Sequence, residues 1–281
     1  MPSTYNPPLV LTIIGTIFIG SALLVALWIL LDICLRKGWQ SMMAVMIPVY
    51  VLNALYLAPI TVWTYIKYGR PVPLESEQKP SCHQKGNMES QEDRAPNLQQ
   101  HRSNRHTGLD PGREGAHDNM SSHARMHHGS SDRPMFATIT IAVCHCGAGC
   151  LLGDVVGEWL VYGAGISINR RSLWAEYLID YGFALLFGII FQYFSIAPMS
   201  GEWGPKTIWR AAKADFLSLT FFEIGLFGWM AISQTAIFEW QLRMDNVVYW
   251  WMMQIGMFLG HWTAFPINYW LIKTGVKESC A

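Results

Sequence analysis

Six apolar stretches, each long enough to cross a lipid bilayer as a helix, constrain this chain more than any other feature of its sequence. A helix needs about 20 mostly apolar residues to span the hydrocarbon core. The stretches cover residues 9–31, 42–65, 136–163, 173–198, 208–238 and 247–272. The first lacks the basic start and the small-residue cleavage site of a signal peptide, so it is interpreted as a retained helix. The sequence predicts an all-α, multi-pass integral membrane protein whose two termini share one side of the lipid bilayer.

Charge is concentrated between the second and third apolar stretches. Only 14% of all residues are charged, yet residues 67–135 hold 19 of the 40 charges and almost no large apolar side chain. Such a segment cannot bury enough apolar surface to offset chain entropy. We therefore expect a two-helix transmembrane hairpin at residues 1–66, a disordered linker at 67–135 and a four-helix transmembrane module at 136–281.

The third stretch begins with the run Cys-His-Cys-Gly-Ala-Gly-Cys at residues 144–150. Cys146, Cys150, Asp154 and Glu158 follow one another at intervals of four residues, so on a helix they form one slowly drifting stripe. An ionised carboxylate in lipid costs on the order of 3 kcal/mol on insertion scales. The stripe is therefore expected to face a partner helix, an ion or water.

Thiols, imidazoles and thioethers together suggest a soft transition metal, for which Cu(I) is the expected ion and zinc the alternative. In an ideal helix Cys144 and His145 point away from the stripe, so a common site requires a loosened turn at Gly147 and Gly149. The predicted ligands are Cys144, His145, Cys146, Cys150, Met257 and His261.

Acidic residues suggest a path for an ion or a proton. Asp154, Glu158 and Glu223 have no cation nearby in the sequence, whereas Asp215 is expected to pair with Arg210 or Lys213. An alternative is a membrane-embedded cyclase or isomerase with carboxylic acids as proton donors. Its candidate acids are Asp154, Glu158, Asp180, Asp215 and Glu223. The cysteines favour a binding or transport protein over an enzyme.

The linker carries a second group of candidate metal ligands near its end: His123, Met126, His127 and His128. A flexible tract of this kind can wrap a copper ion without a preformed geometry. The alternative is a solvated tether whose histidines have no ligand role.

Gly149, Gly153 and Gly157 form a ladder of small residues beside the stripe. Such ladders allow a neighbouring helix to approach closely, so the third stretch is expected at the centre of the bundle. In a third interpretation the ladder is the working surface of an accessory scaffold that binds another copy of the chain or another membrane protein. Net charge is zero and no nucleotide loop or basic patch occurs, so no nucleic-acid partner is expected.

Several motifs together resemble the multi-pass membrane family filed as domain of unknown function 4396. They are the cysteine run at 144–150, Gly153-Asp154, Gly157-Glu158-Trp159, residues 191–194, Ala197-Pro198-Met199, Lys213-Ala214-Asp215, residues 228–231, 253–257 and 266–271, and Lys277-Glu278. The resemblance covers residues 136–278. It implies that the last four helices form one module to which the first two and the linker are added, and it carries no independent statement about activity.

Overall fold

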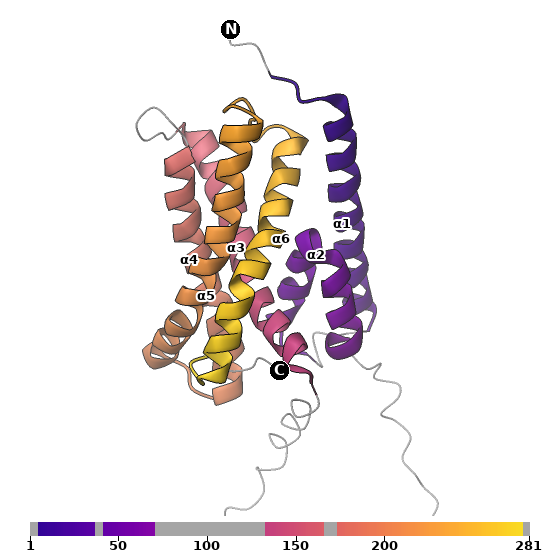
Figure 1. Cartoon of the computed structure of the whole chain (residues 1–281). Coiled ribbons are helices and arrows are strands. Elements are labelled where there is room, and N and C mark those ends of the chain that lie inside the picture. Colours follow the sequence, from indigo (N-terminus) through magenta and orange to yellow (C-terminus); the bar gives the residue numbers. More distant parts are fainter. Residues whose placement is uncertain (1–4, 37–41, 71–132, 166–172, 278–281) are drawn as a thin grey trace, which may run out of the picture.

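The computed structural model describes residues 5–36, 42–70, 133–165 and 173–277, and all its regular elements are helices (Figure 1). The linker, apart from its two ends, lies outside the described residues. The helices are α1 (Leu9–Leu35), α2 (Met46–Thr64) continued by the π-helical turn η2 (Tyr65–Gly69), α3 (Met135–Ala164), α4 (Leu173–Ser200), α5 (Pro205–Ile232) continued by η5 (Ser233–Ile237), and α6 (Val247–Lys273). The predicted all-α fold is confirmed for these residues.

Five helices in the described part of the chain are long and apolar enough to cross a membrane: α1, α2 with η2, α3, α4 and α5 with η5. This composition indicates a multi-pass membrane protein. The helix α6 falls outside the set although it runs beside α5 over its length (Figure 1). Its tryptophan and tyrosine residues, together with Gln254, His261 and Asn268, lower its mean hydropathy.

The segment formed by α2 and η2 folds back on itself. A straight helix would separate Tyr50 from Tyr65 by about 22 Å, but their ring centroids lie 5.4 Å apart. The hydroxyl of Tyr50 also contacts Gly69, and Leu57 has non-helical torsion angles (φ −127°, ψ 37°). The structure therefore has a helical hairpin with its tip at Leu57, where the sequence predicted a single membrane-crossing span.

Pro59 accounts for this reversal. Proline has no N–H and cannot donate to the carbonyl four residues earlier, which here belongs to Leu55. Nε2 of Gln254 in α6 donates to that oxygen instead, at 2.5 Å. A neighbouring helix thus satisfies the carbonyl at the tip, which is how a broken helix is tolerated in a membrane protein.

The base of this hairpin is held by Asp32 at the end of α1. Its carboxylate accepts hydrogen bonds from Arg36 (3.0 Å), Arg70 (2.9 Å) and the hydroxyl of Tyr65 (2.8 Å). The bonds to Asp32 raise the pKa of the exposed Arg70 guanidinium. The pair that Asp32 forms with Arg36, four residues later on the chain, therefore belongs to a larger cluster.

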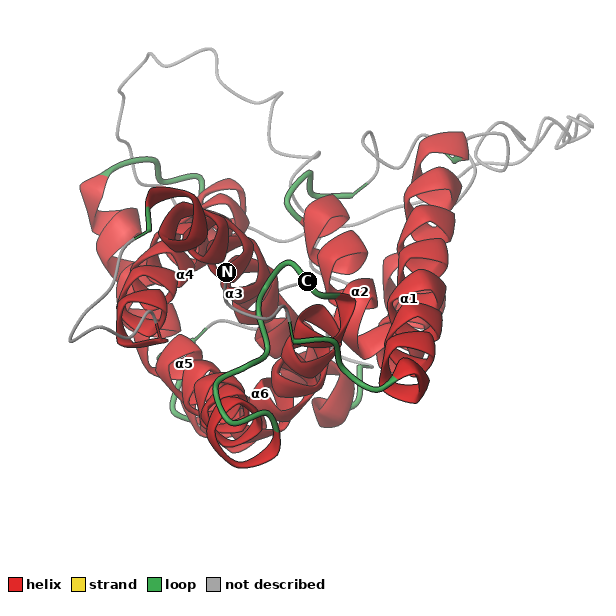
Figure 2. Cartoon of the chain, turned by 90° about the horizontal axis from the view of Figure 1, so that it is seen from above, coloured by secondary structure: helices red, strands yellow, loops and turns green. Residues whose placement is uncertain are grey.

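The ladder of glycines in α3 is the contact surface for α4. A Cβ atom at Gly149 would lie 2.6 Å from Cα of Gly188, and one at Gly153 would meet the backbone of Ala184. Gly157 packs in the same way against Asp180. The expected close approach of a neighbouring helix is confirmed. Seen from above, α3, α4, α5 and α6 form a four-helix bundle with α2 and α1 added on one side (Figure 2).

The two ends of the described chain lie at opposite ends of this bundle (Figure 1). Tyr5 packs against Phe238 in the connection between α5 and α6, with ring centroids 6.5 Å apart. Lys277 contacts Ala142 near the start of α3. Six straight spans would have placed both termini on one side, and the difference follows from the reversal of α2.

Candidate functional site

The stripe predicted on α3 is a buried ridge. Cys146, Cys150, Asp154 and Glu158 are each at most 4% exposed, and α3 is an unbroken α-helix through all four. Successive members lie about 6 Å apart along the helix axis, so the ridge is about 18 Å long. It follows much of the height of the bundle.

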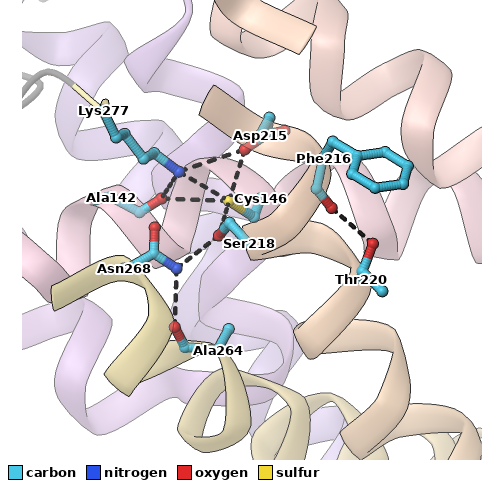
Figure 3. Close-up of polar contacts among 9 residues, drawn as sticks. All are labelled: Ala142, Cys146, Asp215, Phe216, Ser218, Thr220, Ala264, Asn268 and Lys277. Carbon is cyan, nitrogen blue, oxygen red and sulfur yellow. Dashed lines mark hydrogen bonds and ion pairs between the residues drawn. The ribbon is translucent and has the colours of Figure 1, made fainter. Parts of the chain in front are cut away.

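The end of the ridge nearer the start of α3, which is its lower end in the orientation of Figure 1, is a compact polar centre (Figure 3). Sγ of Cys146 donates to Oδ1 of Asp215 in α5 at 2.8 Å. Nζ of Lys277, just beyond α6, lies 3.1 Å from the same sulfur, 3.3 Å from the same oxygen and 3.2 Å from the carbonyl oxygen of Ala142. Lys277 and Asp215 are each at most 1% exposed, so this is a buried ion pair that shares a thiol.

Two neutral side chains extend this centre toward α6. Ser218 Oγ lies 2.8 Å from the sulfur of Cys146, and Nδ2 of Asn268 donates to Ser218 at 2.5 Å and to the carbonyl oxygen of Ala264 at 2.9 Å. Figure 3 shows this chain of contacts between α3, α5 and α6. The hydroxyl and the amide thus connect the thiol of α3 to α6.

The upper part of the ridge is surrounded by acids from other helices. Asp154 interacts electrostatically with Glu158, Asp180 and Glu223, and Glu223 also interacts in this way with the thiol of Cys150. The hydroxyl of Tyr249 in α6 donates to Glu158. These helices thus bring four carboxyl groups and one thiol into a single buried cluster.

Several oxygens in this cluster lack a hydrogen-bond donor. Both carboxyl oxygens of Asp154 and Oδ1 of Asp180 have no hydrogen-bond partner among the described residues, while the carboxyl group of Glu223 lies beside the thiol of Cys150. Buried polar atoms in native proteins are nearly always paired with protein, water or an ion. The cluster therefore has the acceptor groups that a proton, a water chain or a cation would use.

The register of α3 against α4 shows which polar residue lies level with His145. Gly149 faces Gly188 and Gly153 faces Ala184, so one turn further down His145 is level with Gln192. Both residues are buried, and the polar atoms of both side chains have no hydrogen-bond partner in the described residues. The free Oδ2 of Asp215 lies against Gly188 one turn above. A second patch of unpaired polar atoms thus adjoins the Cys146 centre.

The structure does not bring all six predicted metal ligands together. Cys144 is an electrostatic neighbour of Tyr50 and Tyr56 in α2. Met257 lines a cavity of about 210 Å³ between α1, α2, α3 and α6. The turn at 144–150 stays helical, and no group of three or more His, Cys, Asp or Glu side chains among the described residues is close enough to hold a metal ion.

The other predicted ligands have separate positions. His261 is buried in α6, and neither ring nitrogen has a hydrogen-bond partner in the part of the chain that the structure describes. The predicted linker ligands His123, Met126, His127 and His128 lie outside the described residues.

Sequence reasoning missed Lys277, which supplies the cation of the lower centre. Arg210 and Lys213 were expected to neutralise Asp215, but Lys277 is its ion-pair partner, while Arg210 lies 3.7 Å from Glu202. One feature of the sequence does point to the position of Lys277. Gly275 follows the last helical turn, the usual place for a glycine that ends a helix and redirects the chain.

Comparison with known protein families identifies the module that contains this site. The model of one family, described as domain of unknown function (DUF4396), matches residues 135–277, which include the complete ridge, Asp215, Asn268 and Lys277. No curated protein and no solved structure matches the chain. The match covers half of the sequence and coincides with α3 to α6, and the chain therefore belongs to the DUF4396 family.

Proposed function

We propose that this protein binds a soft transition-metal cation, Cu(I), within the membrane and moves it along the ridge of α3. The observation that carries the proposal is the contact between Cys146 and Asp215 at 2.8 Å, fully buried and already in contact with the positive charge of Lys277. A thiolate selects copper in its reduced state, and a carboxylate supplies a compensating charge. This pair is the metal-binding centre of the proposal.

The rest of the ridge gives the ion a continuation. Cys150 lies one turn above Cys146, and the carboxyl cluster of Asp154, Asp180 and Glu223 begins one turn above that. Intramembrane acids of this kind commonly mark ion pathways and proton relays. The order is a soft centre at one end of the ridge followed by hard acceptors toward its other end.

Because no three candidate ligands are preassembled, binding requires rearrangement. The nearest additional groups are Ser218 at the sulfur of Cys146 and the unpaired Oδ2 of Asp215. His145, one residue from Cys146, needs only a local shift of the helix to approach the same point. Zinc is the competing metal, since cysteine and histidine also satisfy its tetrahedral coordination.

Copper binding by purified protein tests the proposal. The full chain in nanodiscs is titrated with Cu(I) against a coloured Cu(I) chelator, in parallel with a form that lacks residues 120–128. We expect one site that persists without the tract and is lost in Cys146→Ser. Cys34→Ser is the matched control, since Cys34 is exposed at the end of α1. Unchanged stoichiometry in a linker-deleted variant without Cys144, Cys146 and Cys150 would reject the thiol site.

A second candidate is passage of protons without metal. The observation that favours it is the acid cluster around Asp154, in which neither carboxyl oxygen of Asp154 has a partner among the described residues. Proteoliposomes with a pH-sensitive dye distinguish the two candidates. Proton flux that is insensitive to Cys146→Ser and lost in Asp154→Asn would favour the proton path. The apolar cavity at Met257 is not lined by any of these acids, so it does not support the embedded-enzyme alternative.

A further inference from the structure

The side chain of Lys277 occupies the position of a bound cation. Its ammonium group has three acceptors of different kinds: the carbonyl oxygen of Ala142 at 3.2 Å, the sulfur of Cys146 at 3.1 Å and Oδ1 of Asp215 at 3.3 Å (Figure 3). The side chain is completely buried. Oxygen and sulfur atoms that converge on one ammonium group can also converge on a metal ion, so the two compete for one place.

The chain around Lys277 is built to turn this side chain inward. Val276 N–H donates to the carbonyl oxygen of Leu271 at 3.0 Å, and Gly275 N–H donates to that of Ile272 at 3.1 Å. With Gly275 at φ +71°, these bonds form the Schellman motif that ends many helices. The motif reverses the chain after α6 and directs the next residue, Lys277, back into the bundle.

The segment that carries Lys277 buries little besides the lysine itself. Thr274 and Gly275 are exposed, Val276 is half-buried and only Lys277 is buried. Withdrawal of the lysine therefore requires new torsion angles at Gly275 and the loss of the cap hydrogen bonds and of the contacts of Lys277 itself. Withdrawal alone is unfavourable because it leaves Asp215 buried without its counter-charge, and an arriving cation removes that obstacle.

We infer that Lys277 is a tethered plug of the Cys146–Asp215 centre, which keeps the site closed until a cation displaces the ammonium group. The inference rests on the proposed function, since it describes how the same site is regulated. A protein whose competent state is only partly populated binds with an apparent affinity reduced by that fraction. Removal of the plug therefore strengthens metal binding, whereas removal of a purely structural ion pair does not.

The first test measures Cu(I) affinity of the full-length chain in nanodiscs. Lys277→Met keeps most of the length of the side chain and removes the charge, and Lys273→Met, at an exposed lysine four residues earlier, is the matched control. We expect binding at the Cys146 centre to tighten about tenfold or more in Lys277→Met and to stay unchanged in Lys273→Met. An unchanged or weaker affinity in well-folded Lys277→Met overturns the plug.

The second test does not depend on copper. N-ethylmaleimide modification of Cys146, followed by mass spectrometry of its peptide, reports whether the thiol is covered. We expect faster modification in Gly275→Ala, where the turn is strained by a side chain at positive φ and the ammonium group that favours the reactive thiolate is kept. We also expect it in the double variant Lys277→Met/Asp215→Asn, which removes both charges beside the thiol.

The two tests separate the possible failures. If no form of the protein binds copper, the proposed function is rejected, while faster modification of Cys146 still supports a plug over a cation site. Equal modification rates in the wild type, Gly275→Ala and the double variant reject the plug, whatever the copper result.

Discussion

Gln254 in α6 donates a 2.5 Å hydrogen bond to the carbonyl oxygen of Leu55, the acceptor that Pro59 leaves without its helical donor. This single bond joins the tip of the α2 hairpin to the four-helix module. It also explains a polar residue in an otherwise apolar stretch of α6. A buried carbonyl group without a partner destabilises the folded protein, so loss of this bond should lower the free energy of unfolding.

Gln254→Leu should lower the thermal unfolding temperature of the protein in nanodiscs. The lost donor leaves a buried acceptor unsatisfied, which costs about 1–3 kcal/mol. Gln241→Leu, an exposed glutamine, is the control and should have little effect. In a Pro59→Ala background the backbone N–H of residue 59 can supply the donor, and the cost of Gln254→Leu should shrink. Equal costs in both backgrounds would contradict this account of the hairpin tip.

The end of the α2 hairpin and the end of α6 should be accessible from the same side of the membrane. We expect cysteines introduced at Lys67 and Thr274, in a background without the native exposed cysteines, to react with an impermeant maleimide from the same face of sealed vesicles. A cysteine at Asn6 should react from the opposite face. A permeant maleimide, which labels all three, controls for exposure. Labelling of Asn6 and Thr274 from one face would mean that α2 crosses the bilayer after all.

Gly153→Ala should destabilise the bundle, because a Cβ atom there meets the backbone of Ala184. Overpacking of this kind typically lowers the free energy of unfolding by about 1–3 kcal/mol, which equals or exceeds the effect of a typical point mutation. Gly163→Ala in the same helix meets nothing within 4 Å and should be neutral or slightly stabilising. Unfolding temperatures of the two variants, measured side by side, test the α3–α4 contact, and similar values would argue against it.

Asp154→Asn should separate stability from function. The carboxyl group has no hydrogen-bond partner among the described residues, so replacing it with a neutral group of equal size removes no known bond. We expect an unfolding temperature equal to or above that of the wild type, together with at least a tenfold loss of ion or proton flux in proteoliposomes. Asp245→Asn, exposed before α6, is the control. A marked loss of stability in Asp154→Asn would point to a structural role.

The fold class, the central place of α3 and the contact surface of its glycines could be predicted because they depend on local spacing. A period of four residues places Gly149, Gly153 and Gly157 on one face whatever surrounds the helix. The same argument placed the thiols and acids of α3 on one ridge. These features are properties of one helix, and hydropathy and spacing report them directly.

Features that depend on contacts between distant segments could not be predicted in this way. The reversal at Leu57 needs Gln254, almost 200 residues later, to satisfy the carbonyl that Pro59 releases. The partner of Asp215 is Lys277 and not its neighbours in the sequence, because the α6 cap turns Lys277 inward. Cys144 is on a different face of α3 from Cys146, and only the position of α2 shows what it contacts.

The folded-back α2 changes how hydropathy plots of such chains should be converted into topology diagrams. Counting every apolar peak as one crossing gives an even number and draws the amino terminus and the linker on one face. When the hairpin is not counted as a crossing, the number of crossings becomes odd. All loops on one side of α2 in the sequence must then be assigned to the opposite face of the membrane. Reporter fusions interpreted with the even count would then assign the thiol end of the ridge to the wrong compartment.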